Sequence, residues 1–149
     1  MKLGKGETVP LPQIINLPNH TVISNPYQRK GVGGRPALVI NHEKFSISTS
    51  GKDLVPLPWG VETTTAMIAP KLFKSESNVK RIFLVSIYCK PNSRKKTALL
   101  DYLSDVYNVM NKQYSEGTHW IIAGESNDLK LDAVLNLSPQ MKQVVNSPT

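Results

Sequence analysis

Oxygen-bearing side chains gather around residue 125, directly after a short apolar run. The run Trp120–Ala123 predicts a strand covered on both faces, and Gly124 is expected to end it because glycine lets the backbone turn without a Cβ clash. Glu125, Asn127 and Asp128 would then emerge together at the carboxyl end of that strand. Their carboxylate and amide oxygens suit a hard divalent cation such as Mg²⁺, which shares its remaining coordination with water and phosphate. On spacing alone, an ordinary polar turn explains these residues better than a metal site does.

A long strand and an amphipathic helix precede this cluster and must position it. The segment Arg81–Cys89 carries apolar residues on both of its sides and predicts the strongest strand of the chain. The turn Lys90–Ser93 stops this strand, and the Ser93 hydroxyl is expected to cap the helix that follows. Apolar residues then recur at helical spacing from Thr97 to Tyr114, which predicts a helix with one face toward a core.

Three cations stand where this helix begins. Arg94, Lys95 and Lys96 precede its first apolar residue, and cations at a helix N-terminus oppose the helix macrodipole. A phosphate of a bound partner therefore explains them better than helix stability does. The competing interpretation is a charged, solvated face of the kind common on protein surfaces.

The rest of the chain predicts several strands and one short helix. In chain order, these are strands at His20–Ser24 and Ala37–Asn41 joined by a hairpin turn, an edge strand around Phe45 and Ile47, a loop at Ser48–Asp53, a central strand at Val61–Ile68, a helix at Leu131–Leu137 and a strand at Met141–Val145. Trp59 follows two prolines and is expected to fill a gap in the core rather than to stack on a base.

Length, charge and cysteine content narrow the class of protein. A chain of 149 residues with 40% hydrophobic content can form one domain with its own core. Its 18 Lys and Arg against 11 Asp and Glu give a formal charge of +7, which favours polyanionic partners such as nucleic acid, and solubility alone would also explain it. Cys89 is the only cysteine, so an intramolecular disulfide is excluded and a reducing intracellular setting is expected. Neither a membrane span nor a secretion signal is expected.

The order of motifs from Arg81 to Asn127 resembles a known superfamily. Strand, Tyr-x-x-Pro-Asn turn, amphipathic helix, strand and Gly-Glu-Ser-Asn follow one another, as in the endonuclease/exonuclease/phosphatase superfamily, whose signature at the last position is Gly-Asp-x-Asn. More narrowly, the segments GVGGRPALVIN, PWGVE, YCKPNSRKKT and HWIIAGESNDLKLDAVLNLSP are similar to the endonuclease domains of LINE-like, non-LTR retroelements. The likeness extends over most of the chain, from about Glu7 onward.

The resemblance implies a fold, an activity and partners. The fold would be an α/β two-layer sandwich of the deoxyribonuclease and apurinic endonuclease type, with mixed, mainly antiparallel sheets and flanking helices. The activity would be that of a metal-dependent phosphodiesterase that nicks DNA with Mg²⁺ or Mn²⁺. The expected partner is DNA, and a reverse transcriptase domain is expected in the full-length protein. The location would be intracellular, in the nucleus, with no membrane association.

The resemblance also assigns roles to individual residues. Glu7 falls at the metal-binding glutamate of the family. Tyr88 matches the tyrosine that orients the scissile phosphate, and Asn92 matches the asparagine of the same turn, so both would contact phosphate, with Arg94 and Lys95 beside them as substrate-phosphate contacts. Asn127 matches the asparagine of Gly-Asp-x-Asn, and Glu125 stands in place of its catalytic aspartate.

Departures from the family pattern leave alternatives open. Glu125 keeps the charge of the aspartate, but its added methylene moves the carboxylate by more than about 1 Å, and catalytic geometry tolerates little displacement. The family's first strand and its terminal Ser-Asp-His motif have no counterpart, so residues 1–149 are expected to form a partial domain with unpaired sheet edges and weak or no nicking activity. Two alternatives are a non-catalytic nucleic-acid-binding remnant of such a domain and a phosphoesterase acting on small phosphate esters.

Overall fold

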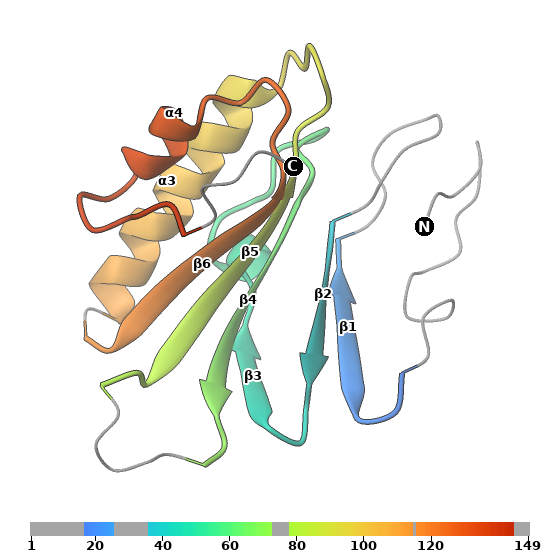
Figure 1. Cartoon of the computed structure of the whole chain (residues 1–149), viewed down its shortest axis with the longest axis vertical. Helices are drawn as coiled ribbons and strands as arrows, with labels where there is room; N and C mark the ends of the chain where they lie inside the picture. Colours follow the sequence, from blue (N-terminus) through green and yellow to red (C-terminus); the bar gives the residue numbers. More distant parts are fainter. Residues whose placement is uncertain (1–16, 26–35, 73–77, 115, 145–149) are drawn as a thin grey trace.

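A four-stranded mixed sheet forms the centre of the protein (Figure 1). The strand order is β3 (Phe45–Thr49), β4 (Thr63–Pro70), β5 (Arg81–Tyr88) and β6 (Thr118–Glu125). The first three strands are antiparallel, whereas β5 and β6 run parallel, as a crossover through a helix requires. That crossover contains α3 (Lys96–Gln113).

The computed structural model describes residues 17–25, 36–72, 78–114 and 116–144. Within these ranges the chain is a small α+β protein with mixed, mainly antiparallel sheets and three helices, the other two being α2 (Gly51–Leu54) and α4 (Leu131–Leu135). No helix in these ranges has both the length and the apolar character that crossing a bilayer requires. Glu7 and the glycine-rich segment 31–34, for which the sequence predicts a metal ligand and a hairpin turn, lie outside the described residues.

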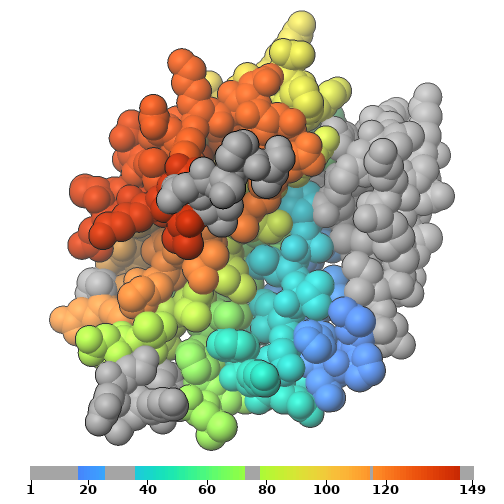
Figure 2. Space-filling view, in the orientation of Figure 1, coloured from blue at the N-terminus to red at the C-terminus, as the bar shows by residue number. Residues whose placement is uncertain are grey.

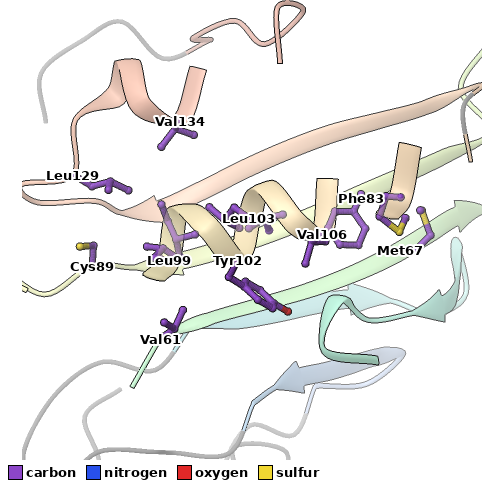
Figure 3. Close-up of a cluster of buried hydrophobic side chains, with 13 residues drawn as sticks. Val61, Met67, Phe83, Cys89, Leu99, Tyr102, Leu103, Val106, Leu129 and Val134 are labelled. Atoms are coloured by element: carbon purple, nitrogen blue, oxygen red, sulfur yellow. The ribbon is translucent and has the colours of Figure 1, made fainter. Parts of the chain in front are cut away.

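One face of the sheet packs against α3, and the main core lies between them (Figure 3). Alternate residues of the central strands point toward this helix, and Phe83 and Met67 are fully buried there. The helix contributes one apolar face, whose buried members are Leu99, Tyr102, Leu103, Val106 and Met110. Each buried side chain of this size contributes about 1.5–3 kcal/mol. Helical periodicity correctly predicted α3, because such a face is a local property of the sequence.

The opposite face of the sheet is covered by a two-stranded hairpin. Strands β1 (His20–Ser24) and β2 (Ala37–Asn41) pair antiparallel, and Ile40 packs against the alternate residues of β4 that face away from α3. The Thr64 hydroxyl donates to the carbonyl of Pro36 at 2.9 Å and ties the hairpin to β4. The predicted bounds of both strands are confirmed. The sheet therefore lies between the hairpin and the helices.

Tertiary contacts contradict the prediction of a loop at Ser48–Asp53. The backbone N–H of Gly51 donates to Thr65 Oγ1 at 2.7 Å, and a Cβ at this glycine would collide with the same hydroxyl. This contact with β4 holds residues 51–54 in the short helix α2. Tyr102 of α3 packs nearby, and burial raises its pKa to about 12, although the Thr65 hydroxyl opposes that rise.

The predicted environment of β6 is also wrong. This strand forms the edge of the four-stranded sheet, and only one of its faces packs, because the side chain of Ile121 on the other face is 51% exposed. The run Trp120–Ala123 is apolar on both faces, but the hairpin lies over β4 and β5 and does not cover β6. The predicted strand at Met141–Val145 is absent from its described part, residues 141–144.

Gly124 allows β6 to approach β5 closely and does not end the strand. Its φ is 139°, and a Cβ at this position would collide with the carbonyl oxygen of Ile87. The strand continues to Glu125, so the prediction that Gly124 terminates it is wrong. A glycine is needed here because the neighbouring backbone occupies the space of a side chain.

We predict that Gly124→Ala lowers the free energy of unfolding by at least about 3 kcal/mol, since β5 and β6 must separate to admit the methyl group. Gly60→Ala is the matched control. Its φ is 80°, but its Cβ would meet only the flexible side chain of Lys95, so the cost should be about 1 kcal/mol. Urea denaturation followed by circular dichroism measures both. Equal losses in the two variants would contradict the close approach.

Candidate functional site

The carboxyl ends of β5 and β6 lie side by side because these two strands are parallel. Tyr88 is the register partner of Glu125, and the N–H of Cys89 donates to the carbonyl of Glu125 at 2.8 Å. On the other side, the N–H of Tyr88 donates to the carbonyl of Glu62 at 3.0 Å, where β4 begins. Ile87 faces the α3 core, so the alternation of β5 places Tyr88 on the opposite face, and the register places Glu125 there with it.

Asn127 joins the turn after β6 to the end of β5. Its side-chain Nδ2 donates to the carbonyl of Cys89 at 2.7 Å and to Glu125 Oε1 at 3.1 Å. Its φ of 43° lies in the left-handed region, which asparagine tolerates better than most residues do. The amide of Asn127 thus restrains the exposed carboxylate of Glu125.

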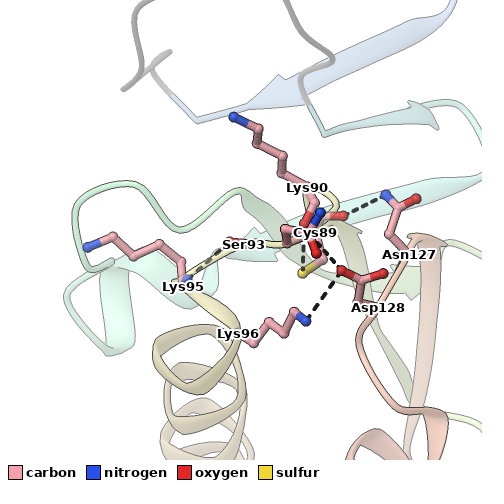
Figure 4. Close-up of polar contacts among 8 residues, drawn as sticks. Cys89, Lys90, Ser93, Lys95, Lys96, Asn127 and Asp128 are labelled. Atoms are coloured by element: carbon pink, nitrogen blue, oxygen red, sulfur yellow. Dashed lines mark hydrogen bonds and ion pairs between the residues drawn. The ribbon is translucent and has the colours of Figure 1, made fainter.

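Asp128 links the two loops at this edge of the sheet (Figure 4). Its Oδ2 accepts a hydrogen bond from the backbone N–H of Asn92 at 2.6 Å and lies 3.5 Å from Lys96 Nζ. The hydrogen bond from Asn92 is the largest cause that lowers the pKa of Asp128. Desolvation opposes it, and the charge of Lys96 lowers the pKa by a smaller amount. Asn92 has a φ of 53°, so its backbone is shaped to present this N–H to Asp128.

The cations at the start of α3 divide into one paired and two exposed residues. Lys96 lies against Asp128, whereas Arg94 and Lys95 are exposed. The predicted cap by Ser93 is wrong. The helix begins at Lys96 without a side-chain cap, and Ser93 Oγ instead accepts from the N–H of Lys95 at 3.0 Å within the preceding turn. Arg94 and Lys95 are therefore exposed on the turn before α3, which the bond between Asp128 and Asn92 and the bond between Ser93 and Lys95 hold in place.

Trp59 is exposed, which contradicts the prediction that it fills a gap in the core. Its side chain is 69% exposed, and Lys95 Nζ lies 5.9 Å from the centroid of its ring. The buried position in this segment belongs to Val61, two residues later, which packs in the main core. The indole therefore lies at the same edge of the molecule as the exposed cations.

Cys89 is a structural residue. It is 3% exposed and packs in the main core as a free thiol, as the sequence predicts. Burial raises the pKa of this thiol, with Lys96 opposing the rise. A neutral thiol is a poor nucleophile, so the chemistry of this edge depends on its oxygen and nitrogen groups.

The oxygen groups at this edge fit the ligand preference of Mg²⁺ only in part. The carboxylate of Glu125 and the carbonyl oxygen of Asn127 are of the required type. In the described part of the chain, however, no group of three or more His, Cys, Asp or Glu side chains could hold a metal ion. His119 is at the amino end of β6, the opposite end from Glu125. A metal at this edge would therefore depend on water and substrate phosphate for the rest of its coordination.

An apolar cavity runs along the exposed edge of β6 and reaches Gly124 and Ser126 beside the candidate site. It has a volume of about 880 Å³ and is bordered by β6, α3, α4 and residues 138–144, with Trp120, Ile122 and Leu135 among its lining residues. Figure 2 shows β6, α4 and the segment after α4, in orange and red, gathered on one flank of the molecule, away from β1 in blue. This cavity does not contain Tyr88, Glu125 or Asn127.

The structure brings together most of the residues that the sequence singled out. Tyr88 and Glu125 are register partners, Asn127 contacts Glu125, and the loop from Asn92 to Lys95 joins them through Asp128. The sequence did not predict the hydrogen bond between Asp128 and Asn92 or the contact between Trp59 and Lys95, because the two partners are 36 residues apart in each case. No protein-family model and no curated protein matches this chain.

We predict that Asp128→Asn removes a pH-dependent part of the stability. The pKa of Asp128 is lower in the folded chain, so its contribution is complete above the ordinary pKa of an aspartate, about 3.9, and is lost as the pH falls through the folded value. The variant should be less stable than the parent at pH 7, and the difference should narrow on acidification. Urea titrations between pH 7 and pH 3 measure this.

Asp105→Asn is the matched control, because Asp105 is an exposed aspartate in the middle of α3. Its free energy of unfolding should follow that of the parent across the whole range. A constant difference between Asp128→Asn and the parent at all pH values would contradict the role of the charge.

Proposed function

We propose that this chain is a phosphodiesterase domain that nicks DNA. The observation that carries the proposal is the meeting of Tyr88, Glu125 and Asn127 at the carboxyl ends of two parallel strands. These residue types supply a phenolic donor, a carboxylate base and an amide, which together suit a phosphodiester and an attacking water. The resemblance to the endonuclease domains of LINE-like retroelements supports the same reaction.

The arrangement of layers supports the finer assignment of the fold. A hairpin on one face of the mixed sheet and α3 on the other are compatible with part of a two-layer α/β sandwich of the deoxyribonuclease type. In such a domain the polar edge at β5 and β6 would be the catalytic edge. The exposed cations Arg94 and Lys95 would then meet the DNA backbone beside it.

The proposed reaction assigns a task to each side chain. The Glu125 carboxylate accepts a proton from water as the water oxygen bonds to phosphorus, the bond from phosphorus to the leaving sugar oxygen breaks, and that oxygen takes a proton from solvent. Asn127 Nδ2 orients this carboxylate through their 3.1 Å hydrogen bond. The Tyr88 hydroxyl would donate to a phosphate oxygen. Bound Mg²⁺ or Mn²⁺ would neutralise phosphate charge. The proposed ligand Glu7, the side-chain carbonyl oxygen of Asn127 and water would hold it, while Glu125 acts as the base.

We predict that the chain converts supercoiled plasmid to open circles only slowly in Mg²⁺, because residues 1–149 hold no counterpart of the family's Ser-Asp-His motif, and that chelation abolishes this conversion. Glu125→Gln should lower the rate at least about 100-fold, because the amide cannot accept the proton, and Asn127→Ala should lower it about tenfold through loss of orientation. Glu43→Gln makes the same charge change in an exposed turn between β2 and β3 and should leave the rate unaltered. Gel electrophoresis of the plasmid follows the reaction. Nicking that persists unchanged in Glu125→Gln would remove this residue from the mechanism.

A second candidate function is nucleic-acid binding without hydrolysis. The specific observation in its favour is that the described residues hold no group of three metal-ligating side chains, while Arg94 and Lys95 remain exposed. The cations alone suffice for salt-dependent binding to a phosphate backbone. This candidate predicts DNA binding with no conversion of the plasmid at any metal concentration.

We predict that the double variant Arg94→Glu/Lys95→Glu weakens binding to a 20-base-pair duplex and lowers the slope of log affinity against log salt by about 2. Lys44→Glu/Lys71→Glu is the matched control. It makes the same change in net charge at the opposite end of the sheet, where the N–H of Lys71 donates to the carbonyl of Lys44. Fluorescence anisotropy in 50–200 mM salt with chelator measures both. Equal losses would indicate a general charge effect in place of a local contact.

A further inference from the structure

The two tryptophans of this chain occupy opposite environments. Trp120 lies between Phe83 and Tyr107, with centroid separations of 4.4 Å and 5.1 Å, and serves the core. Trp59, in contrast, is 69% exposed on the loop between α2 and β4. The exposed indole of Trp59 therefore presents an aromatic face that a ligand can reach, whereas the indole of Trp120 does not.

A short turn, fixed at one end by the buried Val61, carries the exposed indole of Trp59. The N–H of Val61 donates to the carbonyl of Pro58 at 3.2 Å, and Gly60 between them has a φ of 80°. Val61 is 3% exposed and packs in the main core, which fixes the end of the turn. The backbone that carries the indole is therefore fixed in advance, so a ligand would meet a surface that is already ordered.

One cation lies against the indole. Lys95 Nζ lies over one part of the ring, 5.9 Å from its centroid, and the exposed Arg94 adjoins Lys95 in the chain. An apolar protein partner would need further apolar surface around the indole, whereas a phosphate backbone needs the cations. An aromatic face beside cations is the combination that binds single-stranded nucleic acid through stacking and charge.

We infer that Trp59 is a stacking platform for an unpaired nucleobase. The inference rests on the proposed function in one respect, since it takes the cationic edge to bind nucleic acid, and it deepens that function by naming the substrate class. Bases in an intact duplex have both faces covered by their neighbours, so an indole can stack only on a base in a single strand or at an opened site. The preferred ligand of this edge is therefore a strand with at least one unpaired base, whose phosphates contact Arg94 and Lys95.

The test compares a labelled 12-nucleotide oligo-dT strand with a strand of equal length and charge built from abasic units. Binding of the full chain is measured by anisotropy in chelator, so that no cleavage occurs. Trp59→Ala should weaken binding of oligo-dT about tenfold and change binding of the abasic strand less than about twofold. Trp59→Phe should restore most of the affinity because a phenyl ring still stacks. Leu72→Ala, which removes a side chain that is 91% exposed at the other end of the sheet, is the control and should change neither.

A direct signal comes from tryptophan fluorescence. In the variant Trp120→Phe the indole of Trp59 is the only one left, and oligo-dT should quench it whereas the abasic strand should not. The stacking role would be overturned if Trp59→Ala weakened binding of both strands equally or weakened binding of neither. If the stacking role failed but the chain nicked plasmid, the proposed nuclease would stand. If binding depended on the bases but no nicking occurred, the nuclease would be overturned and the platform supported. Binding of neither strand would overturn the stacking platform, whereas the nuclease is tested by plasmid nicking alone.

Discussion

The parallel pairing of β5 with β6 is the constraint on which the rest of the polar edge depends. It requires a crossover, which α3 supplies, and it requires close approach of the two backbones, which Gly124 permits beside Ile87. Because parallel strands end at the same edge, this one pairing places Tyr88 beside Glu125 and brings the two following loops together. The apolar face of α3 stabilises the pairing by packing against Phe83 and its neighbours on one face of the sheet.

The loops at this edge are held by a few charged and amide groups rather than by a buried core. Asn127 ties its own turn to the carbonyl of Cys89, and Asp128 ties it to the N–H of Asn92 and the ammonium of Lys96. Lys96 is thereby engaged within the protein, while Arg94 and Lys95 stay exposed. The contacts of Asp128 involve exposed groups, so they order the loops and add modestly to stability.

The same edge combines three kinds of contact that the proposed binding of a nucleic-acid strand would use. Exposed cations could meet phosphates, and the exposed indole of Trp59 offers an aromatic face. Asn127 contacts the carboxylate of Glu125, whose register partner is Tyr88. Each kind comes from a different segment of the chain. The shape of this edge is consequently decided by how the loops pack on one another. The apolar cavity along β6 reaches the same end of the strand at Gly124 and Ser126.

The amino-acid sequence by itself determined the local elements and part of the site. Strong periodicity predicted α3 and β5, and strand-end logic predicted that Glu125 and Asn127 would lie together, because these signals act over a few residues. Only the tertiary structure decided the helix at Gly51–Leu54, the exposure of one face of β6 and of Trp59, and the bond between Asp128 and Asn92. Each of these depends on which distant segment packs nearby, and an apolar run or a lone acid carries no information about its partner 36 residues away.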